Sequence, residues 1–293
     1  YYPTENQTSD MNRYRAGEVD MTYEIPNDQI KMLRENFKDE LKISSYLGTY
    51  YYGFNLTRPP FKDNPKLREA LTLAIDRDII TDKVTGVGEK PAYSFVPPGI
   101  NGYDHYTPEY ASLDKAARIE KAKKLYEEAG YSKDKPLKIS ITYNTSEAHK
   151  KIMVAIAAMW KQVLGVETEL VNQEWKVMLS NFTQGNIEAY RYGWIGDYND
   201  PYTFLEVFQK SSAMNYSKFS NDAYDAKLKE ASATQDLAAR AKLLQEAEKM
   251  VVDDYAFAPL YYYVPTRLLK PQFKGYAANP TGTLRTQYLH IEP

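Results

Sequence analysis

The sequence of 293 residues contains no cysteine and only three histidines, His105, His149 and His290. Without cysteine there can be no disulfides, thiolate nucleophiles or cysteine-ligated zinc, although the cellular compartment stays undecided. None of the histidines lies in an HExxH pattern, so a histidine metal site is not expected. We predict a protein that binds neither a metal nor a cofactor.

The sequence also lacks an excess of charge and a long apolar run. Lys and Arg number 37 against 39 Asp and Glu, so no net field favours nucleic acid or an anionic membrane. No run of about 18 apolar residues is present, and the first residues show no signal-peptide pattern. We expect a soluble chain, processed or cut from something longer, that binds a small molecule or a protein. The length suggests roughly two domains of about 150 residues.

Common catalytic signatures are missing as well. The sequence has no GxSxG elbow, no Walker loop and no GxGxxG. Carboxylate pairs such as Asp197 with Asp200 could in principle serve glycoside hydrolysis, but the spacing does not distinguish an acid from a nucleophile. We therefore expect a binding protein rather than an enzyme, with a carbohydrate-active enzyme as the alternative.

Tyrosine is abundant, with 27 tyrosines against 10 phenylalanines. Its flat apolar ring and hydroxyl suit surfaces that hold varied ligands by stacking and hydrogen bonding. Tyrosine is also common at half-buried strand positions, so most of these side chains could be structural.

Apolar periodicity and capping residues predict strands that alternate with helices, which indicates an α/β protein. The expected strands are 50–55, 137–143, 166–171, 187–195 and 259–264, and the expected helices are 65–84, 114–129, 146–164, one from about 173, 222–233 and 236–252.

Residues 190–201 (YRYGWIGDYNDP) differ from the rest of the sequence. A strand ends there in glycines, Trp194 and Asp197, which places a carboxylate and an aromatic ring where α/β sheets usually bind ligands. The alternative is a turn in which Asp197 caps the backbone and Trp194 fills the core.

Five separated segments resemble, in the same order, the oligopeptide-binding proteins of ABC transporters. They are 12–21 (NRYRAGEVDM), 144–151 (NTSEAHKK), 172–175 (NQEW), 194–201 (WIGDYNDP) and 259–263 (PLYYY). The resemblance implies a periplasmic-binding-protein-like fold (type II, cluster C), with a mixed sheet flanked by helices. It assigns 49–264 to a peptide-binding lobe, and 1–48 and 265–293 to incomplete pieces of a second lobe. It also implies that an N-terminal part is missing, and that the lobes rotate about crossings near 48 and 264.

The resemblance further implies the residues of a peptide site. Asp197 would pair with the peptide's N-terminal ammonium, which would be costly to bury unpaired. His149, near a helix start, would contact the C-terminal carboxylate, and Arg191 would support the cleft or bind a ligand carboxylate; a structural ion pair of Arg191 and an exposed His149 are the alternatives. Main-chain contacts, pocket walls and a further tyrosine would come from Gly193, Trp194, Ile195, Gly196, Trp175, Tyr263 and Tyr51.

Two positions depart from the family pattern. Gly53 stands where many members carry a glutamate, and Phe182 stands where an arginine often reaches the peptide's C-terminus. The ligand length is therefore open, and a dipeptide, a murein-type peptide or another small solute is an alternative. The resemblance implies a monomeric periplasmic protein that delivers its ligand to an ABC permease and does not bind nucleic acid.

Overall fold

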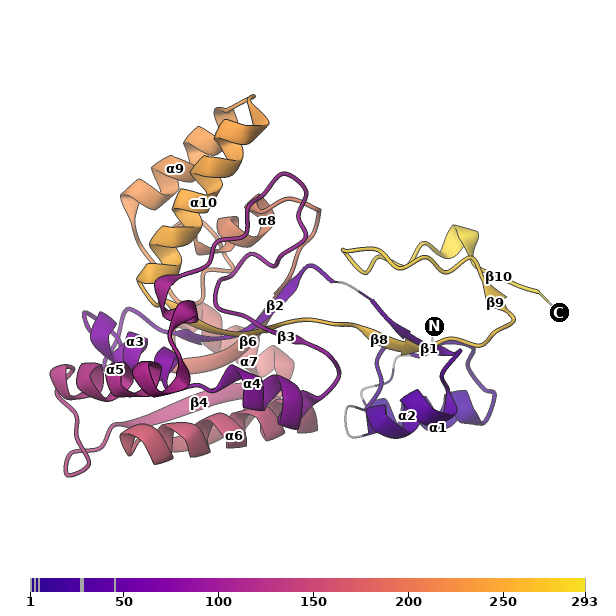
Figure 1. Cartoon of the computed structure of the whole chain (residues 1–293), viewed down its shortest axis with the longest axis horizontal. Coiled ribbons are helices and arrows are strands. Elements are labelled where there is room, and N and C mark those ends of the chain that lie inside the picture. Colours follow the sequence, from indigo (N-terminus) through magenta and orange to yellow (C-terminus); the bar gives the residue numbers. More distant parts are fainter. Residues whose placement is uncertain (1, 3, 5, 27–28, 45, 293) are drawn as a thin grey trace.

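The computed structural model describes residues 2, 4, 6–26, 29–44 and 46–292. Outside the described part lie residues 1, 3, 5, 27, 28, 45 and 293, which belong to the predicted segments 1–48 and 265–293. The chain forms a larger body built on a sheet and a smaller body that contains both ends of the chain (Figure 1).

The sheet of the larger body has the strand order β3-β7-β2-β6-β4-β5. The central strand β2 (Gly48–Phe54) runs antiparallel to β6 (Ala189–Ile195) and to β7 (Phe257–Tyr262), which also pairs with the short β3 (Lys90–Pro91). Strand β4 (Lys138–Asn144) is parallel to both β5 (Glu167–Gln173) and β6. The expected α/β fold with a mixed sheet is confirmed.

Helices cover both faces of this sheet. One face packs against α3 (Pro65–Leu73), α5 (Lys115–Glu128) and α6 (Glu147–Leu164). The other packs against α7 (Trp175–Gln184), α8 (Tyr202–Leu205), α9 (Asp222–Ala233) and α10 (Leu237–Asp253). Helix α6 shows why such segments form, because Ser146 caps its start and Gly165, at φ +81°, ends it.

The helix predicted over 65–84 is interrupted, contrary to the sequence-based expectation. Helix α3 ends at Leu73, and a new start follows in α4 (Arg77–Ile79) and a π-helical segment, η2 (Ile80–Thr85). The Asp76 side chain accepts a hydrogen bond from the Ile79 amide at 3.2 Å and so caps the new start. Arg77 turns inward and donates to the carbonyls of Ala92 and Pro259, each at 2.8 Å. Periodicity alone could not reveal this buried arginine.

The smaller body combines the two ends of the chain. It contains α1 (Gln7–Arg15), α2 (Ile30–Asn36) and two antiparallel pairs, β1 (Leu41–Ile43) with β8 (Thr266–Leu268) and β9 (Phe273–Lys274) with β10 (His290–Ile291). Its apolar core also receives Val87 from the larger body, and Arg34 donates to the Val87 carbonyl at 2.7 Å. Besides the two chain crossings, the contacts between the bodies include this one and a hydrogen bond from the Leu47 amide to the Pro280 carbonyl at 2.7 Å.

Short 3-10 segments complete the described chain: η3 (Glu109–Ser112), η4 (Glu206–Phe208) and η5 (Thr286–Tyr288). Among the described helices, none combines the length and the apolar character that crossing a membrane requires.

Candidate ligand-binding site

Four of the five segments that carry the resemblance, 144–151, 172–175, 194–201 and 259–263, meet at one edge of the sheet, whereas 12–21 lies in the smaller body. Strands β4, β5, β6 and β7 point the same way, so their carboxyl ends lie together, and β2 begins at that edge because Gly48 pairs with Ile195. At or just beyond these ends lie Asn144, the last residue of β4, His149 in the first turn of α6, Trp175 at the start of α7, and Asp197 and Tyr263 in the loops after β6 and β7. Carboxyl ends of strands are where ligands commonly bind in such sheets.

Arg191, on β6, is held by neutral partners only. Its guanidinium donates to the Tyr263 hydroxyl at 2.8 Å and to Asn144 Oδ1 at 3.1 Å, and it lies 4.4 Å from the centre of the Tyr50 ring. Its Nε is buried and has no partner within the described part of the chain. No described carboxylate forms an ion pair with it. This half-buried cation is therefore suited to an external anion.

His149 lies next to this cation but does not add to its charge. Its Nδ1 is 3.3 Å from the Tyr50 hydroxyl, and the two rings lie 5.6 Å apart. Burial, and then the positive charge of Arg191, lower the pKa of His149 to about 2. The imidazole is thus neutral at physiological pH, so it can contribute a hydrogen bond but no positive charge.

Two glycines allow Tyr263 to reach Arg191. A Cβ on Gly193 would lie 2.3 Å from the Tyr263 hydroxyl, and a Cβ on Gly48 would lie 2.9 Å from Cδ2 of the same ring. Real Cβ atoms do not approach other atoms so closely. The absence of side chains at these two positions places the tyrosine flat against the end of the sheet.

The other face of the same edge is aromatic. Trp175 stacks on Tyr192 with ring centres 5.9 Å apart, and it remains 39% exposed. Trp194 is half-buried, and its indole N–H has no partner among the described residues. Phe182 is buried against Tyr216, with ring centres 4.1 Å apart. This chain therefore has an aromatic cluster at the position where, by the resemblance, an arginine often stands.

Asp197 follows the end of β6 as predicted, and residues of this chain do not enclose its carboxylate as a closed peptide site would. The side chain is exposed, and it accepts no hydrogen bond from a described residue. Its backbone N–H donates to Thr203 Oγ1 at 3.2 Å, so the alternative of Asp197 as a backbone cap is not observed. The carboxylate is exposed because no described segment packs over it.

Asp200, the other acid of the segment, is engaged. Both of its carboxylate oxygens accept hydrogen bonds from Arg240, at 2.7 and 2.9 Å. A carboxylate tied up in this way is poorly placed to serve as one member of a hydrolytic pair.

Tyr51 is a correction to the predicted set. It is 3% exposed and packs with Phe95 and Phe257 in the core, on the face opposite Arg191. Tyr50 is the residue that contacts Arg191, and neither Tyr50 nor Asn144 was among the predicted site residues. Alternation along β2 could have separated Tyr50 from Tyr51 only if the register with β6 had been known, because Tyr50 pairs with Gly193.

Ile195 and Gly196 complete the predicted set at the end of β6. Ile195 pairs with Gly48, and the amide of Gly196 donates to the Leu47 carbonyl at 2.8 Å. Strand β6 pairs with β2 over its whole length but with β4 only at Ala189 and Tyr190. Residues 191–195 therefore have one backbone edge that no neighbouring strand occupies within the described chain.

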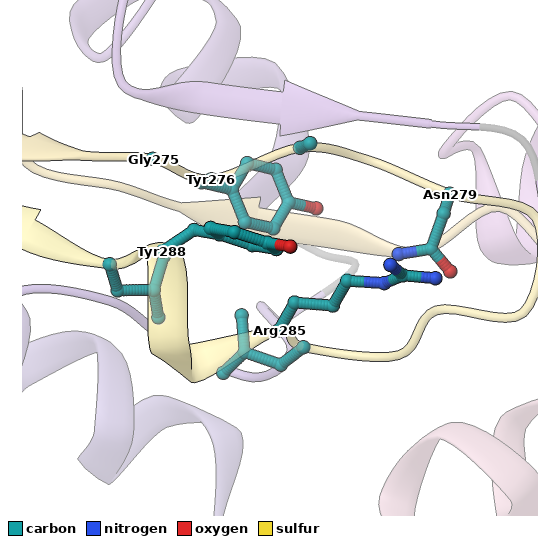
Figure 2. Close-up of a pocket in the computed structure, with 8 residues that line it drawn as sticks. Gly275, Tyr276, Asn279, Arg285 and Tyr288 are labelled. Atoms are coloured by element: carbon teal, nitrogen blue, oxygen red, sulfur yellow. The ribbon is translucent and has the colours of Figure 1, made fainter.

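A separate pocket lies in the smaller body, lined among others by Gly275, Tyr276, Asn279, Arg285 and Tyr288 (Figure 2). None of the predicted site residues lines it. No cluster of three or more histidine, aspartate or glutamate side chains within the described residues could hold a metal ion.

Comparison with known proteins gives concordant results. Residues 1–216 match the family described as bacterial extracellular solute-binding proteins, family 5 Middle. The chain is 41% identical over 293 residues to the periplasmic oligopeptide-binding protein OppA of Escherichia coli, covering 99% of this chain and 54% of that protein. The chain thus spans about half the length of the curated relatives it matches.

Solved structures agree with the sequence matches. The murein tripeptide binding protein MppA of Escherichia coli has a TM-score of 0.94 at 38% identity, covering 99% of this chain and 57% of that one. The unliganded open form of MppA, with 99% and 56% covered, gives a TM-score of 0.82 at the same 38% identity. OppA of Haemophilus influenzae, solved in complex with the peptide RPPGFSPFR, has a TM-score of 0.91 at 41% identity, with 98% and 57% covered.

Proposed function

This chain belongs to the bacterial extracellular solute-binding proteins of family 5, and we propose on that basis that it supplies one wall of a cleft that captures short peptides. The single observation that carries the proposal is a pair of unsatisfied opposite charges at one sheet edge. Arg191 has no carboxylate partner, and the Asp197 carboxylate has no donor, among the described residues.

These two charges match the two ends of a peptide. Asp197 lies six positions after Arg191 in the sequence, so their backbones lie at most about 20 Å apart. An extended peptide of a few residues can therefore place its ammonium at Asp197 and its carboxylate at Arg191, with neutral His149 beside the carboxylate.

The peptide backbone would use the free edge of β6. Residues 191–195 lack a neighbouring strand on the side of β4, and an extended peptide can add to such an edge through main-chain hydrogen bonds. Such contacts do not depend on the peptide's sequence. Trp175 and Trp194 would border the side-chain pockets, which accept varied residues when water fills the remaining space.

The proposed division has residues 49–264 as the peptide-binding lobe and 1–48 and 265–293 as pieces of the other, and the presence of two bodies in the structure supports it. A longer protein would cover the pocket of Figure 2 and the exposed Tyr23 and Ile43. The better match to one MppA structure than to its open form supports movement between lobes. By itself, this chain should bind peptide weakly.

The relatives' printed names support the rest of the proposal. Oligopeptide-binding and murein peptide-binding relatives are described as periplasmic. By extension, the whole protein is exported to the periplasm, acts as a monomer without catalysis and delivers its ligand to an ABC permease.

Substitution of Asp197 tests the function directly. In the full-length protein, Asp197→Asn should weaken binding of a free-amine tripeptide by about tenfold or more, because a charge-assisted hydrogen bond is lost. Isothermal calorimetry measures this change, and the N-acetylated tripeptide serves as the control ligand. Equal affinity of wild type and variant for the free-amine peptide would refute the assignment. Mass spectrometry of co-purified solute then separates oligopeptides from murein peptides or other solutes.

A further inference from the structure

The segment that carries Asp197 is an exposed loop with one strong attachment. Residues 197–199 are exposed, and the chain becomes buried again at Pro201 and Thr203. The loop starts from Gly196, which donates to the Leu47 carbonyl. Between Gly196 and Pro201, the charged side chain that attaches the loop to the rest of the protein is Asp200.

That tie connects the loop to helix α10. Arg240, in the first turn of α10, donates to both oxygens of Asp200, and the same carboxylate accepts a hydrogen bond from the Tyr202 amide at 2.8 Å. The two side chains are 23% and 28% exposed, so the pair is partly withdrawn from solvent. The hydrogen bond that Arg240 donates to Asp200 is the main cause that raises the pKa of Arg240. A bidentate pair of this kind fixes orientation as well as distance.

We infer that Arg240 and Asp200 are positioning residues that hold the Asp197 loop in the orientation needed for the ligand's ammonium. This inference rests on the proposed function. Asp197 itself is attached only through its backbone, to Thr203, so its carboxylate depends on the loop for its direction. Besides Asp200, the side-chain attachment of this loop is the hydrogen bond from the Tyr198 hydroxyl to Glu206 Oε1 at 3.2 Å, so releasing Asp200 removes the loop's charged attachment.

A purely structural role would give a different result. Exposed ion pairs usually contribute little to stability, and a loss of fold would weaken all ligands equally. A positioning role instead affects only the contact with the ammonium. The informative quantity is therefore the ratio of affinities for a peptide with a free amine and the same peptide acetylated.

The experiment measures this ratio by calorimetry, with tri-alanine and N-acetyl-tri-alanine, on the full-length protein. Arg240→Ala should lower the ratio by about tenfold, the size of one charge-assisted hydrogen bond, while affinity for the acetylated peptide is retained. Arg240→Lys and Asp200→Asn keep much of the local packing and should lower the ratio in the same direction if Arg240→Ala fails to fold.

Lys227→Ala is the matched control. It removes an ion pair to the same helix α10, with Glu246 at 2.6 Å, but not near the loop, and the ratio should stay at the wild-type value. A wild-type ratio in the Arg240 and Asp200 variants would overturn the inference while leaving the proposed function intact. If the wild-type protein shows no preference for the free amine, the role proposed for Asp197 fails first, and the positioning role fails with it.

Discussion

Gly53 illustrates how one missing side chain determines its neighbour's position. A Cβ at this position would lie 2.1 Å from Cζ of Tyr190, whose ring covers the glycine on the adjacent strand. The space in which relatives of this chain could place a side chain is therefore filled from β6. A ligand cannot use position 53 as a contact.

Gly53→Ala should destabilise the protein by about 1–3 kcal/mol, because overpacking forces Tyr190 off its position. Urea denaturation followed by circular dichroism measures the change. In the Tyr190→Leu background, where the smaller side chain leaves room, Gly53→Ala should cost less stability than it does in the wild type. Additive effects of the two changes would show that the clash does not exist.

Individual site residues differed in how well the sequence predicted them. Asp197 and Trp194 were found because a carboxylate and an aromatic ring follow a strand at a recognisable end. The uncharged surroundings of Arg191 were not predictable, because they come from Tyr50, Tyr263 and Asn144 on three different segments. The exposure of Asp197 depends on what covers it, which the local sequence does not encode.

A buried carboxylate on helix α10, that of Glu248, connects the helix to residues 95–103 through hydrogen bonds. Glu248 accepts hydrogen bonds from the amides of Phe95 and Val96, at 3.0 and 2.7 Å, and from the Tyr103 hydroxyl at 2.6 Å. Burial raises the pKa of Glu248 to about 7, although these donors oppose the shift. The carboxyl thus changes its charge near neutral pH.

The raised pKa predicts the sign of a pH effect. A folded-state pKa above the unfolded value of 4.5 means that the native state binds more protons between these values, so this contribution to stability is complete below pH 4.5 and is lost as pH rises through about 7. Relative to the wild type, Glu248→Gln should therefore gain stability between pH 5 and 8, by roughly 3 kcal/mol at most.

Urea unfolding at pH 5, 6, 7 and 8 tests this expectation. Glu246→Gln, on the same helix, is the control, because the pKa of exposed Glu246 is lowered from 4.5 by Lys227 and its effect should be flat over this range. His149 contributes the opposite slope as pH falls below 6.5 in both proteins, so it cancels in the comparison. The prediction would be contradicted if the free energy of unfolding of the wild type rose relative to that of the Glu248→Gln variant as pH increases.

Most elements were predictable because their signals are local. The cap at Asn64, the alternation in 137–143 and the glycine after α6 each act over a few residues, and the helices at 115–128 and 147–164 lie close to their expected bounds. The break after Leu73 was missed because its cause is tertiary. Arg77 binds carbonyls that are up to 182 residues away in sequence.

The two bodies of the molecule differ in the size of their cores. Among the residues that the structure describes, the apolar clusters on the two faces of the sheet contain 28 and 25 buried residues, whereas the cluster of the smaller body contains seven. Apolar burial provides most of the favourable free energy of folding. The smaller body should accordingly open first in this chain.

Hydrogen exchange on the 293-residue chain checks this order. Backbone amides of β1 and β8 should exchange faster than those of β2 and β6, on the order of tenfold for each ~1.4 kcal/mol of lower opening free energy. The comparison is made under native conditions by mass spectrometry of peptide fragments. Equal protection of the two strand pairs would mean that the chain unfolds as a single unit.

The sequence indicated a division of the chain near 48 and 264, but not the contact at Val87 that joins the two bodies. Val87 lies within the stretch assigned to one lobe, yet its side chain packs in the core of the smaller body. A single valine in a loop gives no signal of such a partner, because both α2 and the loop are needed to form the contact.

The contact between Arg34 and Val87 favours, in the ligand-free protein, the relative orientation of the two bodies in which α2 lies against residue 87. Any turn that carries α2 away from residue 87 must break the 2.7 Å bond from Arg34 and bring Val87 into water. A hydrogen bond to a charged group contributes about 1.5–3 kcal/mol, which is enough to set a population ratio of tenfold or more. If the protein works as proposed, its resting equilibrium is biased before any ligand arrives, and residues remote from the proposed cleft take part in setting its apparent affinity.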